Sequence, residues 1–224
     1  MITWLAPGDP PDRFPPVEQA LPEPPGLLAA GGDLTPERLL AAYRRGIFPW
    51  YSPGQPVLWW SPDPREVLLP GEFHCARSLK RSIRREAFEW RQDGDFAAVI
   101  RACAAPRSVS PGTWITPAMI GAYERMHALG YAHSIETWQR GTLIGGLYGI
   151  RLGRVFFGES MFSRATDASK AALAGLIERC EALGLELIDC QMASPHLRSL
   201  GSRALPRTEF LLRLAQALES APVA

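Results

Sequence analysis

Hydrophobic and polar positions alternate along residues 131–160 in a pattern that predicts three consecutive β-strands. Strand-like segments cover 131–138, 143–152 and 154–160, and turn residues separate them at 139–142 and at Gly153. Glycines inside the middle run indicate a bulge or the close approach of another group. A helix-length segment at 167–183 and a strand-like run at 185–192 follow. A crossover helix of this length joins parallel strands, so we expect a mixed sheet.

Polar groups at the ends of the last two predicted strands mark a candidate active site. Glu159 follows an apolar strand, and Asp189 and Gln191 interrupt the next one. Open α/β sheets tend to place ligands where such strand ends converge. We therefore expect these three side chains to lie together and to serve chemistry.

The first part of the chain has a different character. Residues 1–30 are rich in proline, which predicts an extended arm. A helix is predicted after Thr35, which is placed to cap it; Pro36 suits its first turn, Tyr43 belongs to its apolar face and Gly46 ends it. The pattern changes near residue 65. The prediction is an α+β protein with a small N-terminal α/β domain at 1–64 and a larger domain at 65–224.

Tryptophans and aromatic residues gather at 48–62, among turn-forming prolines. Such clusters commonly fill a small core, but their flat faces also suit stacking on a nucleobase. Both interpretations stay open for Trp50. Trp114 lies just before a predicted helix that Thr116 caps, where it either packs on the helix as a staple or projects into a cleft. Asp95 is predicted to cap the helix before that one.

A predicted helix at 77–86 carries five cations on one face: Arg77, Lys80, Arg81, Arg84 and Arg85. An ordinary solvated face usually mixes charges of both signs, whereas like charges repel unless a polyanion neutralises them. We expect this helix to contact a phosphate backbone.

Composition excludes several classes. The formal net charge of the 224 residues is +1, so any nucleic-acid contact must be local. Four cysteines and four histidines show no metal-binding spacing, and we expect no metal. No apolar run approaches the roughly 20 residues of a membrane span. We expect a soluble, cytoplasmic protein.

The order of elements after residue 131 is similar to the N-acetyltransferase-like (GNAT) core. That fold ordinarily holds the pyrophosphate of acyl-CoA in a glycine-rich turn before the crossover helix. The corresponding segment here, 161–166, contains no glycine. A CoA-dependent N-acyltransferase is therefore disfavoured, although it remains the alternative enzyme. A non-catalytic RNA-binding module is the second alternative, and it would not need the polar strand ends.

Several blocks, in order along residues 26–212, resemble the bacterial leucyl/phenylalanyl-tRNA–protein transferases. They are Gly31-Gly32-Asp33-Leu34, Gly46-Ile47-Phe48-Pro49-Trp50-Tyr51, Leu58-Trp59-Trp60-Ser61-Pro62, Gly112-Thr113-Trp114-Ile115, Ala132-His133-Ser134-Ile135-Glu136, residues 158–163, Ile188-Asp189-Cys190-Gln191 and Ser199-Leu200-Gly201.

The resemblance implies a monomeric aminoacyltransferase that takes leucine or phenylalanine from Leu-tRNA or Phe-tRNA. The acceptor would be a protein or peptide with an N-terminal arginine or lysine, which becomes an N-end-rule degradation substrate. The ester is already activated, so no cofactor is expected.

The resemblance also implies roles for individual residues. Asp189 and Gln191 belong to the reacting centre, and Trp50 and Trp114 to an adenine-stacking pair. Tyr123 and Phe156 line the same entrance. The aminoacyl side chain is assigned to a pocket of Leu147, Glu159, Leu176 and Ile188. Leucine, phenylalanine or methionine fits such a slot better than a β-branched residue.

Overall fold

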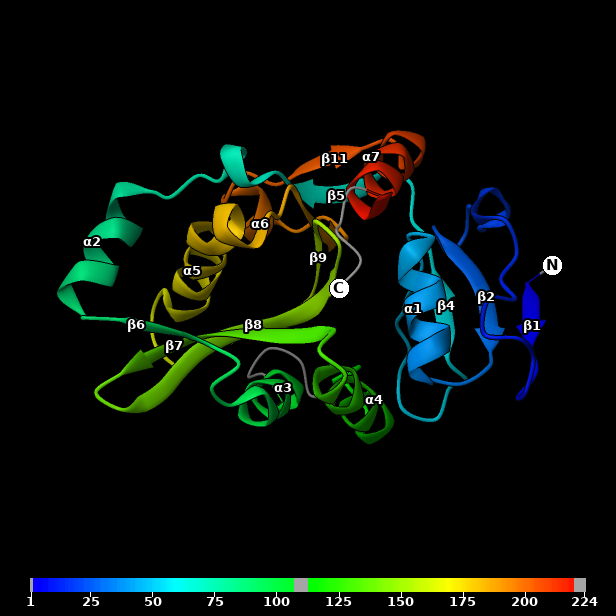
Figure 1. Ribbon diagram of the computed structural model, residues 1–224, viewed down its shortest axis with the longest axis horizontal. Helices are drawn as coiled ribbons and strands as arrows, with labels where there is room; N and C mark the ends of the chain where they lie inside the picture. The colour runs from blue at the N-terminus through cyan, green and yellow to red at the C-terminus, as the bar shows by residue number, and fades with distance from the viewer. Residues whose placement is uncertain (1, 107–112, 220–224) are drawn as a thin grey trace.

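The computed structural model describes residues 2–106 and 113–219, which form two β-sheets with helices packed around them (Figure 1). Gly112, part of one of the family-like blocks, lies outside the described residues.

A four-stranded sheet comes from the N-terminal part, in the order β1 (Thr3–Leu5), β2 (Leu27–Gly31), β4 (Leu58–Trp60) and β3 (Phe48–Pro49). Strand β2 is buried along its whole length. Helix α1 (Pro36–Arg44) packs beside this sheet. The predicted arm therefore supplies two strands, with a short 3-10 helix at Val17–Gln19 between them.

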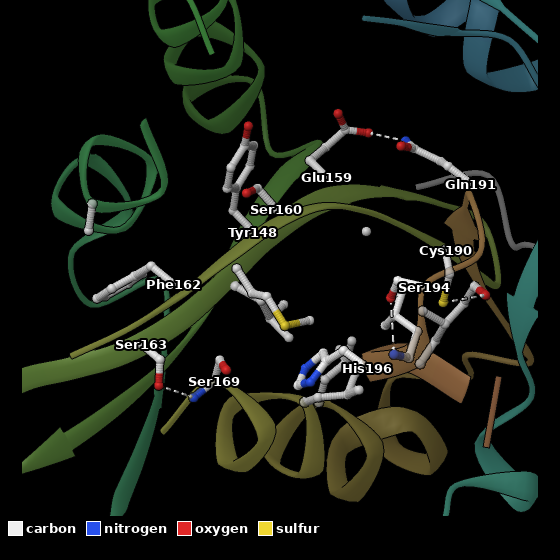
Figure 2. A pocket seen from close by; sticks show the side chains of 18 of the residues that line it. Tyr148, Glu159, Ser160, Phe162, Ser163, Ser169, Cys190, Gln191, Ser194 and His196 are labelled. Atoms are coloured by element: carbon white, nitrogen blue, oxygen red, sulfur yellow. Dashed lines mark hydrogen bonds between the residues drawn. The ribbon is translucent and has the colours of Figure 1, made fainter. Parts of the chain in front are cut away.

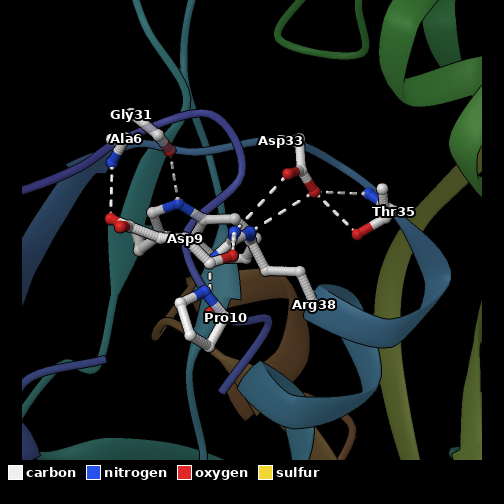
Figure 3. Close-up of polar contacts among 8 residues, drawn as sticks. Ala6, Asp9, Pro10, Gly31, Asp33, Thr35 and Arg38 are labelled. Atoms are coloured by element: carbon white, nitrogen blue, oxygen red, sulfur yellow. Dashed lines mark hydrogen bonds and ion pairs between the residues drawn. The ribbon is translucent and has the colours of Figure 1, made fainter. Parts of the chain in front are cut away.

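Arg38 of α1 holds the N-terminal arm in place (Figure 3). Its guanidinium is almost fully buried and donates to the carbonyl oxygens of Asp9 (2.8 Å) and Pro10 (3.3 Å). It also pairs with Asp33 at 3.3 Å. The predicted Thr35 cap is wrong, since no cap bond to the helix forms. The Thr35 hydroxyl donates instead to the Asp33 carboxylate at 2.7 Å, a stronger, charge-assisted acceptor.

The larger sheet has seven strands in the order β11-β5-β10-β9-β8-β7-β6. Along the chain these are β5 (Arg65–Leu68), β6 (Glu89–Gln92), β7 (Ala132–Gln139), β8 (Thr142–Leu152), β9 (Val155–Ser163), β10 (Leu187–Gln191) and β11 (Arg203–Leu205). Among the described strands of this sheet, only β9 and β10 pair in parallel. The predicted mixed sheet and its GNAT-like order are confirmed.

Strand β9 is longer than predicted, because Phe162 and Ser163 continue the ladder with Gly146 and Gly145 of β8. The first half of the expected turn at 161–166 is thus strand. The bulge predicted in the middle strand is present at Ile144, the extra residue of β8 opposite Thr137 and Trp138. A second irregularity opposite Tyr148 and Gly149 belongs to β9, where Glu159 is the extra residue.

Helix α5 (Ala168–Leu183) covers one face of the large sheet, and α3 (Phe96–Ala104) and α4 (Pro117–Ala128) lie on the other (Figure 1). Asp95 and Thr116 cap α3 and α4 as predicted, accepting from main-chain N–H groups at 2.9 and 3.3 Å. Helix α2 (Arg77–Arg85) packs on α5. A second 3-10 helix, at Pro70–Glu72, lies between β5 and α2. Two further helices follow β10: α6 (Pro195–Arg198) and α7 (Arg207–Glu219).

Helix α1 also contacts α4 and α7, so the N-terminal sheet is joined to the larger unit through packed helices. Buried side chains from both sheets form one continuous apolar cluster. A second cluster lies beneath α5. The division at residue 65 stays a prediction.

Candidate active site

A cavity of about 840 Å³ opens between β8, β9, β10 and α5 (Figure 2). Its apolar wall contains Leu147, Leu176 and Ile188 of the predicted pocket and also Phe156, which was assigned to the entrance; all four are buried. Trp114, Glu159 and Gln191 also line it. The structure thus brings together seven of the ten residues assigned to the reacting centre and the substrate pocket. Trp50, Tyr123 and Asp189 lie outside the lining.

The parallel register of β9 and β10 explains why Glu159 and Gln191 meet. Asp189 stands opposite Phe157, so the positions two residues further on are neighbours. Gln191 Nε2 donates to Glu159 Oε1 at 2.8 Å (Figure 2). This contact fixes the Gln191 amide with its nitrogen on Glu159. Within the described residues no group donates to its carbonyl oxygen, which can accept a hydrogen bond.

Two tyrosines complete the surroundings of the Glu159 carboxyl group. The hydroxyl of Tyr43, on α1, donates to Oε1, and the hydroxyl of Tyr123, on α4, donates to Oε2, both at 2.8 Å. The two hydroxyls also lie 2.5 Å apart. Burial raises the pKa of Glu159 to about 7, against the opposing effect of the hydrogen bonds from Tyr43, Tyr123 and Gln191. Tyr123 therefore binds Glu159 from behind and does not line the entrance.

Asp189 is fully buried and forms a bidentate ion pair with Arg65 of β5. The Arg65 Nε and Nη2 atoms donate to the two carboxylate oxygens at 2.8 and 2.6 Å. One of those oxygens also accepts the main-chain N–H of Gln191 at 2.9 Å. Gln191 has φ of 63°, a left-handed conformation that is unfavourable for a residue with a side chain. Asp189 thus contacts the backbone of Gln191 and not the cavity.

The tryptophans differ in burial, and nucleobase stacking by Trp50 and Trp114 stays a prediction. Trp59 is fully buried and donates to the Gly31 carbonyl at 2.9 Å, so it fills the core. Trp50 is half-buried and packs against Trp60 with 5.6 Å between ring centres. A hydrogen bond of 3.0 Å between the hydroxyls of Tyr51 and Thr116 joins the Trp50 segment to the start of α4, close in sequence to Trp114.

The five cations of α2 line one surface hollow together: Arg77, Lys80, Arg81, Arg84 and Arg85. Leu79, buried on the opposite side, anchors the helix. Arg85 pairs with Glu86 at 2.8 Å. Within residues 2–106 and 113–219, the other four cations have no acidic partner within 4 Å.

Cys190 and His196 also line the cavity. Burial raises the pKa of the Cys190 thiol, so its thiolate is not available as a nucleophile. Burial, with the nearby Lys170 cation, lowers the pKa of His196, which favours the neutral imidazole. In the described part of the chain, no three histidine, cysteine or acidic residues are grouped to hold a metal ion. None of the described helices has the length and apolar character that a membrane crossing requires.

Two residues of the site escaped sequence reasoning. Tyr43 was assigned to the apolar face of a helix, and nothing local indicates that its hydroxyl reaches a carboxylate 116 positions away. Arg65 stood at the expected domain boundary. The charged pair Arg65-Glu66 at the start of an apolar strand was the available signal, because buried strands seldom carry charges without partners.

Residues 67–215 match the family model described as leucyl/phenylalanyl-tRNA protein transferase, and residues 32–63 match the model of that family's N-terminal domain. The chain belongs to this family. It is 61% identical over 197 residues to the leucyl/phenylalanyl-tRNA–protein transferase of Azotobacter vinelandii, covering 88% of this chain and 87% of that one. Identity to the protein of the same name from Aromatoleum aromaticum is 60% over 222 residues, or 99% and 92% of the two chains.

Similar solved structures include L-PGS from Bacillus licheniformis, with a TM-score of 0.43, 9% identity, and coverage of 74% of this chain and 54% of that chain. A GCN5-related N-acetyltransferase from Kribbella flavida has a TM-score of 0.38 at 13% identity, covering 75% and 60%.

Proposed function

We propose that this protein is an aminoacyltransferase that moves leucine or phenylalanine from aminoacyl-tRNA to the N-terminal arginine or lysine of an acceptor protein. The modified protein becomes an N-end-rule substrate, and the enzyme acts as a cytoplasmic monomer. One observation carries the proposal. This member of the family has an apolar cavity, and Glu159 and Gln191 line it in hydrogen-bond contact with each other.

The reaction needs orientation more than activation, because the ester on tRNA is already reactive. The acceptor's α-amine attacks the ester carbonyl, and the ribose oxygen of the terminal adenosine leaves. The Gln191 amide is too weakly basic to take a proton. Its carbonyl oxygen accepts an N–H of the amine and directs the lone pair at the carbonyl carbon. Asp189 holds Gln191 in the conformation that this task requires.

The aminoacyl side chain packs against the wall formed by Leu147, Phe156, Leu176 and Ile188. These four side chains offer apolar contact and no polar group. Trp114 and Trp50 contribute aromatic faces for the adenine. Helix α2 contributes four cations without acidic partners among the described residues, and these suit the phosphates of the tRNA acceptor stem. The preference for arginine or lysine acceptors rests on the family.

A CoA-dependent N-acyltransferase is the competing function, and the start of α5 argues against it. The N–H groups of Ala168 and Ser169 already bond to the Ala165 carbonyl and the Ser163 hydroxyl, at 3.1 and 3.2 Å. The Ala171 N–H bonds to the Asp167 carbonyl at 2.8 Å. Few main-chain donors are left there for a pyrophosphate.

The test is transfer from labelled Leu-tRNA to a peptide that begins with arginine, with an otherwise identical alanine-start peptide as control. We expect label in the arginine peptide alone. Failure of wild-type protein to label it would refute the proposed function. A shift in thermal unfolding on adding acetyl-CoA would support the competing enzyme.

A further inference from the structure

The ring of contacts among Tyr43, Tyr123 and Glu159 contains one proton too few. Three oxygen–oxygen contacts close the ring: the two hydroxyls on each other at 2.5 Å, and each hydroxyl on one carboxyl oxygen at 2.8 Å. The two tyrosines bring two protons, so only two of the three contacts contain a hydrogen when Glu159 is ionised. A proton on Glu159 fills the third contact and makes the ring continuous.

We infer that Glu159, held by Tyr43 and Tyr123, accepts the proton that the α-ammonium group of the acceptor must lose before it attacks the aminoacyl ester. This inference rests on the proposed function, since it assigns a proton acceptor to that reaction. Glu159 acts as the catalytic residue, and the two tyrosines act through it as positioning residues.

The location of Glu159 suits this role. It lines the cavity, its side chain is slightly accessible, and it stands beside Gln191, which directs the amine. Oε1 receives Tyr43 and Gln191, whereas among the described residues Oε2 receives Tyr123 alone and keeps a lone pair that can accept another donor. The raised pKa of Glu159, about 7, lies close to the pKa of about 8 of a free α-amino group, so the proton is nearly balanced between the two.

The step balances in protons and electrons. The Glu159 carboxylate takes one proton from the ammonium group, and the freed lone pair forms the C–N bond to the ester carbonyl. The carbonyl oxygen carries the negative charge until the C–O bond to the ribose breaks. The ribose oxygen takes the second proton from nitrogen. Glu159 releases its proton to solvent when the product leaves.

Several groups face Glu159 and set its proton affinity. Tyr43 comes from α1, Tyr123 from α4 and Tyr148 from β8, whereas Asp189 and Gln191 come from β10. The Asp189 charge raises the pKa of Glu159 much less than burial does, and Arg65 lies directly on the Asp189 carboxylate. Removing a hydroxyl donor from the ring moves the pKa of Glu159 upward, because ionised Glu159 loses a charge-assisted hydrogen bond, which is stronger than the neutral contacts that protonated Glu159 loses.

The experiment measures kcat/KM for an arginine-start peptide across pH 5–10 in wild type, Tyr43→Phe, Tyr123→Phe and Glu159→Gln. Each tyrosine variant should move the acid limb about one pH unit upward, the equivalent of one hydrogen bond to a charged group. Glu159→Gln should lower kcat/KM near pH 7 about 100-fold. Its activity should then rise through the pKa of the peptide amine without declining above it.

Tyr51→Phe is the matched control. It removes a buried hydroxyl from the bond to Thr116, which also joins the N-terminal part to α4, and its acid limb should coincide with that of wild type. Infrared difference spectra of wild type without substrate should show a buried carboxyl group titrating near pH 7, absent from Glu159→Gln. This readout does not depend on turnover, so it separates the inference from the proposed function.

Unmoved acid limbs in both folded tyrosine variants, with transfer intact, would overturn the inference. So would infrared spectra in which Glu159 shows no titration near neutrality. Thermal unfolding identifies a variant that has lost its fold. If one tyrosine variant is unfolded, the pH profile of the other and the infrared spectra of wild type test the inference. A wild type that titrates at Glu159 but transfers nothing would instead refute the proposed function.

Discussion

Arg65 and Asp189 form a fully buried ion pair that fixes the backbone of Gln191. The Arg65 guanidinium lies between the rings of Phe48 and Phe210, 4.7 and 4.8 Å from their centres. The pair therefore joins β3 of the N-terminal sheet, β5 and β10 of the large sheet, and α7 at one point. A buried charge pair does not by itself stabilise a fold strongly, but removing one partner leaves the other charge without compensation.

Replacing Arg65 should separate stability from positioning. Arg65→Met should lower the free energy of unfolding by about 3–5 kcal/mol, because Asp189 is left buried and unpaired. Arg65→Lys keeps the charge but not the two parallel hydrogen bonds, so the carboxylate loses its fixed orientation. We expect Arg65→Lys to lower kcat at least tenfold, with little change in KM for Leu-tRNA. Urea unfolding and steady-state kinetics measure the two effects.

The double variant Arg65→Met with Asp189→Leu provides the control. Removing both charges should recover much of the stability lost in Arg65→Met. Its kcat should stay low, since the Gln191 N–H has lost its acceptor. An Arg65→Lys enzyme with wild-type kcat would show that the ion pair serves stability alone.

The part of the site that lies on β9 and β10 could be predicted from the local pattern of hydrophobic and polar residues. Both strands and the helix between them follow from periodicity, and the parallel register then places Glu159 beside Gln191. The partners of these side chains come from far away in the chain. Tyr43 and Arg65 reach Glu159 and Asp189 across 116 and 124 positions, and no sequence periodicity encodes such distances.

The short edge strands also escaped prediction, for a different reason. Strand β6 is mostly exposed and β11 has only three residues, so neither carries an alternating apolar pattern. These two strands are held in place by hydrogen bonds to longer neighbours, β6 to β7 and β11 to β5. The cap at Thr35 was wrong because a local cap rule does not include the carboxylate of Asp33, which takes the hydroxyl.

Charge reversal on α2 tests its role in tRNA binding. Arg81→Glu with Arg84→Glu should raise KM for Leu-tRNA at least tenfold at low salt and weaken the dependence of KM on salt, because phosphate contacts are lost. An aminoacyl-adenosine analogue, which has no acceptor stem, should be used as well as by wild type. Arg44→Glu, on the exposed side of α1, serves as the control for reversing a surface charge. Equal loss with both substrates would assign the helix a structural role.

The apolar wall of the cavity should set the choice between leucine and phenylalanine. Leu176→Phe adds volume at a buried lining position and should shorten the space for the aminoacyl side chain. We expect kcat/KM for Phe-tRNA to fall about tenfold or more relative to that for Leu-tRNA, a typical effect of a changed apolar pocket. Competition between the two labelled substrates measures the ratio. An unchanged ratio in a folded variant would place the side chain elsewhere.

The raised pKa of Glu159 predicts how stability depends on pH. The folded state keeps the Glu159 proton up to about pH 7, whereas the unfolded chain releases it near the ordinary value of 4.5. Between these two values the folded state binds the extra proton, so the free energy of unfolding falls as pH rises. The contribution is fully present below pH 4.5 and is lost as pH passes 7, a change of about 3 kcal/mol.

Glu159→Gln removes this titration, so its free energy of unfolding should decline less steeply than that of wild type across the same window. The slopes are compared, and not the absolute stabilities, since the amide also changes the hydrogen bonds to both tyrosines. Tyr43→Phe should extend the decline to higher pH, because ionised Glu159 then has one donor fewer. Urea unfolding at half-unit steps from pH 4 to 8 measures all three proteins. Parallel curves for wild type and Glu159→Gln would mean that Glu159 is already ionised at pH 5 in the folded protein.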